Sequence, residues 1–406
     1  MKKYSYLIYL LLFFSIFRSF LIPLVGVTYA SLAAGFINIL LAGFIAFWVK
    51  DTFYLSIIKV FSILMLLPTF FSALPLWKIC AGYLETISPY IILTGATNIR
   101  FLRKIEISIK DFENIILIFI SILLLGHFLS LIGFELPSLS SVPISTWGAE
   151  SIDTQIVEKI KGRVSSFVGS SGPYSMSIAY LFIAYAILNS SNKAKIIFLG
   201  LIVQILSFSR SGFVLLLVYL FFEYLPKTME YISASKIKLS FKSFFGYLIT
   251  LFVFFVIIFI YKDILVFQVE RIFYLFTFSN DVSNSVRFDR MNMAFEYINK
   301  NIFSLILGSG TGITARVAGG EQFESQIFKI IVEWGLLGIS IVILWLNKTI
   351  SLSKNLKIED LSLLATFLVN LIVIQAFTSA PIISSMGIAL IAKTLKKHNT
   401  SIANSY

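Results

Sequence analysis

The stretch IIFLGLIVQILSFSRSGFVLLLVYLFF, residues 196–222, places one arginine, Arg210, in a short polar seam between two apolar runs. The seam, SFSRSGF (207–213), gives this arginine only small hydroxyl residues and a glycine as close neighbours. Each flanking run is apolar enough to be a membrane segment or part of one. The stretch therefore predicts two membrane helices that meet at a charged turn, and an ionisable residue in such a place indicates a functional site.

The composition of the whole chain predicts an integral membrane protein. Of its 406 residues, 58% are hydrophobic and only 13% are charged, whereas soluble domains carry about 25% charged residues. The first apolar run, from Tyr4 to about Val25, is long enough to span the bilayer and another follows at once, so no cleavable signal is evident. The single Cys80 excludes an intramolecular disulfide.

Apolar runs of bilayer-crossing length divide the chain into about 12 predicted spans. They are 4–25, 30–49, 53–74, 76–97, 113–134, 173–189, 195–209, 211–225, 243–261, 324–346, 361–379 and 381–393. The seventh, eighth and twelfth are short, which is typical of tilted, re-entrant or buried segments. The expected fold is an all-α integral membrane protein with one polytopic domain over residues 1–406.

The basic residues orient these spans. With both termini in the cytoplasm and alternating sides, 19 basic residues lie inside and 11 outside, as the positive-inside rule requires. The net charge of +12 is thereby explained without nucleic acid as a partner. However, 17 of the 19 inside are lysine, whereas 6 of the 11 outside are arginine. Because the guanidinium fork suits phosphate and carboxylate groups, the outer face is predicted to bind an anion.

Two long outer loops, 135–172 and 262–323, are expected to form the active-site side, with short amphipathic helices at the membrane surface. Apolar residues in 287–307 recur at helical spacing, with Arg287 and Arg290 on one face of the expected helix. The following GSGTG (308–312) lacks the rest of a phosphate-binding loop and is interpreted as a turn that ends this helix.

Four segments together resemble the O-antigen polymerase and O-antigen ligase superfamily of bacterial envelope glycosyltransferases. They are the seam SFSRSG, the loop RFDRMNMAFEYINKNIFSLILGSGTG (287–312), the span ESQIFKIIVEWGLLG (324–338), and RVSSFVGSSGP (163–173) before an earlier span. The order and spacing of these segments carry the resemblance, since each motif alone is loose.

The resemblance implies a GT-C-like membrane fold and an active site that faces the periplasm or exterior of the plasma membrane. Its implied reaction joins undecaprenyl-diphosphate-linked repeat units into a surface polysaccharide, O-antigen or capsule, without a metal or another cofactor. Arg210 and Arg287 would stabilise the diphosphate leaving group. Arg163 and Arg290 would hold phosphate or an acidic sugar. Ser211 and Gly310 are further candidates for substrate binding.

One position departs from the family pattern. Many ligase-like members have a histidine nine residues before the position of Glu333, where this chain has Glu324, and its two histidines, His127 and His398, lie elsewhere. Glu324 would then have to act as the base that accepts the proton of the attacking sugar hydroxyl. The departure favours a polymerase over a ligase.

Several alternatives remain at this stage. The chain could be a ligase that moves finished glycan to another acceptor, or a flippase without enzymatic activity. Arg210 could be an interfacial anchor, Arg287 and Arg290 could pair with nearby aspartates on a solvated face, and Glu324 could be a helix N-terminal acid. Besides donor, acceptor and bilayer, a chain-length regulator and a flippase are candidate partners.

Overall fold

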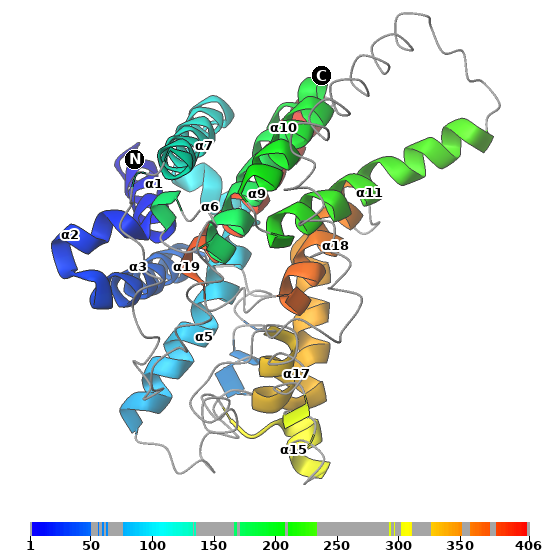
Figure 1. Cartoon of the computed structure of the whole chain (residues 1–406). Coiled ribbons are helices and arrows are strands. Elements are labelled where there is room, and N and C mark those ends of the chain that lie inside the picture. The colour runs from blue at the N-terminus through cyan, green and yellow to red at the C-terminus, as the bar shows by residue number, and fades with distance from the viewer. Residues whose placement is uncertain are drawn as a thin grey trace, which may run out of the picture.

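The computed structural model describes residues 2–49, 76–132, 166–168, 171–207, 210–233, 302–310, 326–350, 358–373 and 379–403, with a few single positions between them (Figure 1). All regular secondary structure in these residues is helical. The longer helices are α1 (Lys2–Ile16), α3 (Val27–Trp48), α5 (Leu76–Ala96), α7 (Ile109–Leu131), α9 (Ser171–Leu188), α10 (Lys193–Leu206), α11 (Arg210–Ser233), α17 (Gln326–Ile350), α18 (Ile358–Val373) and α19 (Ala380–Ala403). Shorter helical pieces are η1 (Arg18–Leu21), α2 (Ile22–Val25), α6 (Ile99–Lys104), η3 (Ser166–Val168), η4 (Ser190–Asn192) and α15 (Ile302–Leu307).

Two helices of the described ranges, α7 and α17, are long and apolar enough to cross a membrane. The number rises to four if each of two bent pairs is one span: α1 with η1 and α2, bent by 93°, and α9 with α10, bent by 115°. The coarse prediction of an all-helical chain with membrane-crossing helices is therefore supported. The predicted span 243–261 and most of 53–74 lie outside the described residues.

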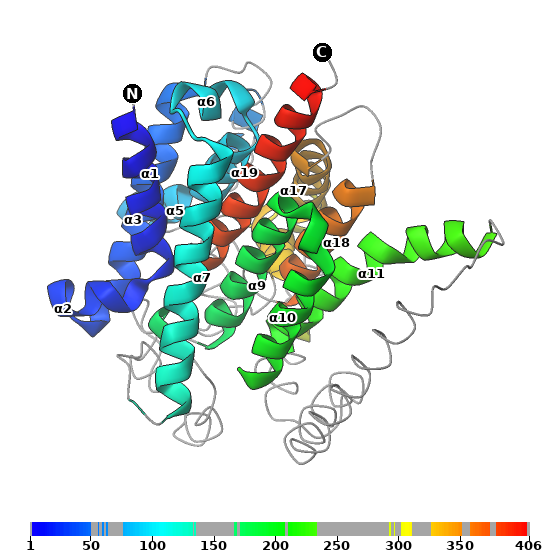
Figure 2. The ribbon, with the colours of Figure 1, turned by 90° about the horizontal axis from the view of Figure 1, so that it is seen from above.

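Helix α9 forms the centre of the bundle, where it packs against α7, α10, α11 and α19 (Figure 2). Its sequence, SGPYSMSIAYLFIAYAIL, is apolar or small on every side, which is the pattern of a helix without a solvent-exposed face. Residues 174–184 are all buried. The buried hydroxyl of Tyr180 accepts a hydrogen bond from Asn370 Nδ2 on α18 at 3.0 Å, as a buried polar group requires.

The helices alternate in direction between two ends of the bundle. At the first, called the terminal end, α1 begins and α19 finishes (Figure 2); there Arg103 Nε on α6 donates to His398 Nε2 at 2.6 Å. At the second, called the seam end, α1 finishes and α19 begins, and Ser15 Oγ donates to the carbonyl of Ala380 at 3.1 Å. The starts of α9 and α11 lie at the seam end, since Gly212 N donates to Ser175 Oγ at 2.9 Å.

The predicted span 4–25 is not one continuous helix. Helix α1 ends at Ile16, and Phe17 leaves helical geometry at φ −93°, ψ 62°. Arg18 then turns its Nε to the carbonyl of Val168 at 3.2 Å, and Pro23 lies in the first turn of α2, a position that suits its fixed φ. The apolar count did not detect this break, because Arg18 and Ser19 are followed by another apolar run, 20–25.

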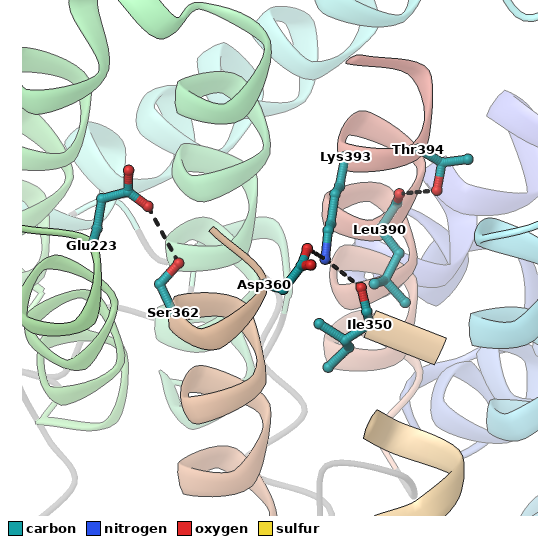
Figure 3. A network of polar contacts seen from close by, with 7 residues as sticks. All are labelled: Glu223, Ile350, Asp360, Ser362, Leu390, Lys393 and Thr394. Carbon is teal, nitrogen blue, oxygen red and sulfur yellow. Dashed lines mark hydrogen bonds and ion pairs between the residues drawn. The ribbon is translucent and has the colours of Figure 1, made fainter. Parts of the chain in front are cut away.

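Two buried ion pairs join α10, α11, α18 and α19 near the terminal end. Lys193 Nζ lies 2.8 Å from Glu223 Oε1, with both side chains almost fully buried. Lys393 pairs with Asp360 and also donates to the carbonyl of Ile350. Figure 3 shows how the start of α18 serves both sides, because Ser362 donates to Glu223 at 3.4 Å while Asp360 faces Lys393. Burying any one of these four charged groups without its partner would strongly destabilise the folded protein.

We expect Lys193→Ala to lower the free energy of unfolding by about 3–5 kcal/mol, because it leaves the Glu223 carboxylate buried without its cation. Thermal unfolding of the purified protein in detergent measures the effect. Lys195→Ala is the matched control, since Lys195 is exposed on the same helix and its loss should cost less than about 0.5 kcal/mol. Equal midpoints for the two variants would show that the pair contributes nothing.

Candidate functional site

Near the start of α9, at the seam end, Ser175 forms hydrogen bonds with two neighbouring helices. Ser175 Oγ donates to Gln204 Oε1 on α10 at 2.6 Å and accepts from Gly212 N on α11 at 2.9 Å. Gln204 Nε2 in turn donates to the Ser175 carbonyl at 2.8 Å. One serine thus ties three helices together, and in apolar surroundings such a fully satisfied set of hydrogen bonds fixes a single geometry.

The seam of the sequence has a definite shape at this point. Helix α10 ends at Leu206, and Arg210 is the first residue of α11. Two residues later, Gly212 lies so close to α9 that a Cβ there would be 2.4 Å from the Ser175 carbonyl oxygen and 2.5 Å from Gln204 Oε1. The glycine of SRSG is therefore a packing requirement: it lets the first turn of α11 touch the backbone of α9.

This contact places the seam beside the residues that directly follow another segment of the family resemblance, 163–173. The segment 163–173 leads into α9, and the seam leads into α11. Their first helical turns meet through Ser175 and Gly212 although 37 positions separate them in the sequence. Sequence analysis singled out the seam but missed Ser175 and Gln204, whose only signal is a polar residue inside an otherwise apolar run.

On its other side the first turn of α9 meets α7. Tyr174 Oη and His127 Nδ1 are 2.6 Å apart, and His127 is 5% exposed. The second ring nitrogen, Nε2, is buried and has no hydrogen-bond partner among the described residues. A buried polar atom in this state needs an explanation. Sequence analysis set His127 aside because its position did not match the family's histidine.

The short helix η3 packs against α7 on this side of the seam end. Ser166, with φ 47°, donates through Oγ to the carbonyl of Leu123 at 2.8 Å. A Cβ on Gly126 would lie 2.3 Å from Ser166 Oγ, so that glycine admits η3 against α7. Because Val168 also accepts from Arg18, η3 links α7 to the break after α1.

A second close backbone contact joins α15 to α17. Gly335, at φ 66° and ψ −168°, interrupts α17, and carbonyls next to such a break need donors from elsewhere. Ser309 N donates to the Val332 carbonyl at 2.9 Å and Gly310 N to the Glu333 carbonyl at 3.0 Å. The GSG turn thus supplies donors for a broken helix, and Glu333, the acid of the Glu-x-Gly-x-x-Gly ending, is fully buried beside it.

Glycine is required on both sides of this contact. A Cβ on Gly308 would lie 2.2 Å from the Glu333 carbonyl oxygen, and one on Gly335 would lie 2.3 Å from the Ile306 carbonyl oxygen. The prediction that the glycine-rich stretch ends a loop helix is confirmed in this respect: α15 ends at Leu307, directly before Gly308. Its partner on α17 was not foreseen.

Helix α15 itself turns apolar side chains outward. Ile302 and Phe303 are 68% and 69% exposed, far above what an aqueous surface usually tolerates next to other apolar groups. Leu336, beyond the break in α17, is also exposed. This surface fits lipid hydrocarbon better than water.

No family model matches the sequence, and no curated protein matches it.

The structure describes only part of the predicted site. Arg210 begins α11 at the seam end, Ser211 follows it half-buried, and Gly310 is buried in the turn against α17. The other predicted site residues lie outside the described residues: Arg163, Arg287, Arg290 and Glu324. Within the described ranges, no three His, Cys, Asp or Glu side chains are grouped closely enough to hold a metal ion.

We expect Gly212→Ala to destabilise the protein by about 1–3 kcal/mol, because the added methyl group meets a backbone carbonyl that cannot move aside. Thermal unfolding in detergent measures the change. Gly43→Ala on α3 is the control: its Cβ would meet no atom within 4 Å, so it should be neutral or stabilise by about 0.5–1 kcal/mol. A Gly212→Ala protein as stable as Gly43→Ala would contradict the close approach of α9 and α11.

Proposed function

We propose that the chain is a polytopic membrane glycosyltransferase of the bacterial envelope. It polymerises undecaprenyl-diphosphate-linked oligosaccharide repeat units into a surface polysaccharide at the outer face of the plasma membrane. The observation that carries the proposal is the contact between its motif segments. Gly212 of the seam meets Ser175 of α9, two residues past the segment 163–173, and the GSG turn meets the Glu-x-Gly segment at Gly310 and Glu333.

These contacts support a common role for the segments, because residues that serve one reaction must be close in space and held rigidly. Two of the four segments touch directly, the GSG turn and the Glu-x-Gly segment, and the seam touches α9 just past the end of a third; both contacts use glycines that admit no side chain. A cluster of this kind positions neighbouring side chains, among them Arg210, with little freedom of the backbone beneath them.

The direction of the helices supports the membrane orientation. In the proposed orientation the terminal end is cytoplasmic, and the seam end faces outward together with Arg210. The described helices then run in the directions that the alternation of 12 spans requires. The exposed basic residues of α6, Arg103 among them, lie at the terminal end, where the positive-inside rule places such charges.

The proposed reaction is an inverting glycosyl transfer. A hydroxyl on the distal sugar of one lipid-linked unit attacks the anomeric carbon of the growing chain. The bond between that carbon and the diphosphate oxygen breaks, and undecaprenyl diphosphate leaves with the bonding electrons. Arg210 and Arg287 stabilise the charge that develops on the diphosphate, because a guanidinium fork binds two phosphate oxygens at once.

Deletion of the gene in its native host tests the function, with gel analysis of the surface glycan as the readout. A polymerase predicts that the ladder of long chains disappears while a single repeat unit still reaches the final acceptor. Loss of all surface glycan with accumulation of long lipid-linked chains would identify a ligase instead. Accumulation of single units on the cytoplasmic face would identify a flippase.

Arg210→Lys tests the proposed leaving-group contact. The substitution keeps the charge but removes the planar fork, and we expect polymerisation by the purified protein to fall about 10²-fold, as for loss of one donor to a developing anion. Arg100→Lys, at an exposed position of α6, should keep wild-type activity. A fully active Arg210→Lys enzyme would exclude a bidentate grip on the diphosphate.

A further inference from the structure

We propose that His127 is the general base of this glycosyl transfer and that Tyr174 holds its ring in the reactive orientation. The proposal rests on the proposed function and assigns a residue to the step for which the family resemblance offered Glu324. An attacking sugar hydroxyl must lose its proton as the new bond forms, and histidine is the residue most often used for this work at neutral pH.

The geometry at the end of α7 carries the assignment. His127 lies in the last turns of α7, and Tyr174 lies in the first turn of α9. The 2.6 Å contact between Tyr174 Oη and Nδ1 fixes one side of the imidazole. The other nitrogen, Nε2, is buried and has no hydrogen-bond partner among the described residues. A ring held by a hydrogen bond at one nitrogen, with the second nitrogen left for a further partner, is the arrangement of a histidine base that works through that second nitrogen.

The contact with Tyr174 is compatible with the tautomer that the reaction needs, because a tyrosine hydroxyl can accept a hydrogen bond as well as donate one. For Nε2 to accept a proton it must carry a lone pair, so Nδ1 carries the hydrogen and donates it to Tyr174 Oη. In the transfer, the hydroxyl proton passes to Nε2 as its oxygen bonds to the anomeric carbon. The diphosphate leaves as an anion, and the imidazolium returns its proton to water before the next cycle.

The same turn of α9 connects this histidine to the seam. Tyr174 contacts His127, the next residue, Ser175, contacts Gly212, and Gly212 is two residues from Arg210. Adjacent residues of one helical turn thus contact the histidine and the backbone of the first turn of α11. The other histidine, His398, pairs with Arg103 at the terminal end, far along α19, and serves as a control.

Purified wild-type protein, His127→Ala and His398→Ala are compared in proteoliposomes with undecaprenyl-diphosphate-linked repeat units, and chain lengthening is followed on gels. We expect His127→Ala to lose polymerisation about 10²-fold or more, to regain part of it with added imidazole, and to remain folded, with a melting midpoint lowered by the loss of the contact with Tyr174. His398→Ala should polymerise normally. Half or more of wild-type activity in His127→Ala, or a loss that imidazole does not relieve, would overturn the proposal.

Tyr174→Phe keeps the proposal testable if His127→Ala does not fold. This substitution removes only the hydroxyl that orients the ring, and we expect polymerisation to fall about 10-fold, as for one lost hydrogen bond to a reacting group. Unchanged polymerisation in Tyr174→Phe would contradict the assigned role. If wild-type protein itself leaves the repeat units unjoined, the proposed function fails and the role of His127 fails with it.

Discussion

The hydroxyl group of Ser175 is the point on which the seam end depends. It donates to Gln204 and accepts from the backbone of Gly212, so a single side chain sets the spacing of α9, α10 and α11. The surroundings are apolar, and a buried donor left without a partner there would cost about 1–3 kcal/mol. Any displacement of α11 therefore breaks hydrogen bonds between buried groups. The backbone of Arg210, at the start of α11, is therefore held in place as well.

At the terminal end, two buried ion pairs connect neighbouring helices. Lys193 with Glu223 joins α10 to α11, Lys393 with Asp360 joins α19 to α18, and the hydrogen bond from Ser362 to Glu223 connects the two pairs. Buried ion pairs of this kind add little net stability over apolar packing, but they penalise every arrangement in which one partner is missing. They favour one relative position of the paired helices along their axes, because a shift would separate the buried charges.

Much of the helix content could be predicted from the sequence, because apolar runs are a direct record of burial in a bilayer or core. The predicted spans 113–134 and 173–189 correspond closely to α7 and α9. Helix α19 extends to Ala403, ten residues past the predicted limit, since helix formation does not require apolar residues. The break at Phe17 was missed, because the contact that accompanies it joins Arg18 to Val168, 150 residues away in the sequence.

The site was predictable only in part, for the same reason. Arg210 and the glycines of GSGTG are conspicuous in the sequence, whereas Ser175, Gln204 and Tyr174 are ordinary residues in apolar runs until a partner helix is beside them. His127 was set aside because a lone histidine has no meaning without the hydroxyl that orients it. Pair contacts between distant segments are a property of packing, and composition or periodicity carries no trace of them.

The break at Gly335 has a consequence for how this part of the protein opens. It separates Gln326–Trp334 from the rest of α17, and a segment of that length extends only about 14 Å, too short to be a stable helix by itself. Two of its carbonyls depend on donors from Ser309 and Gly310. Neither piece can come away and leave the other intact, so α15 and the first part of α17 should open and close as one cooperative unit.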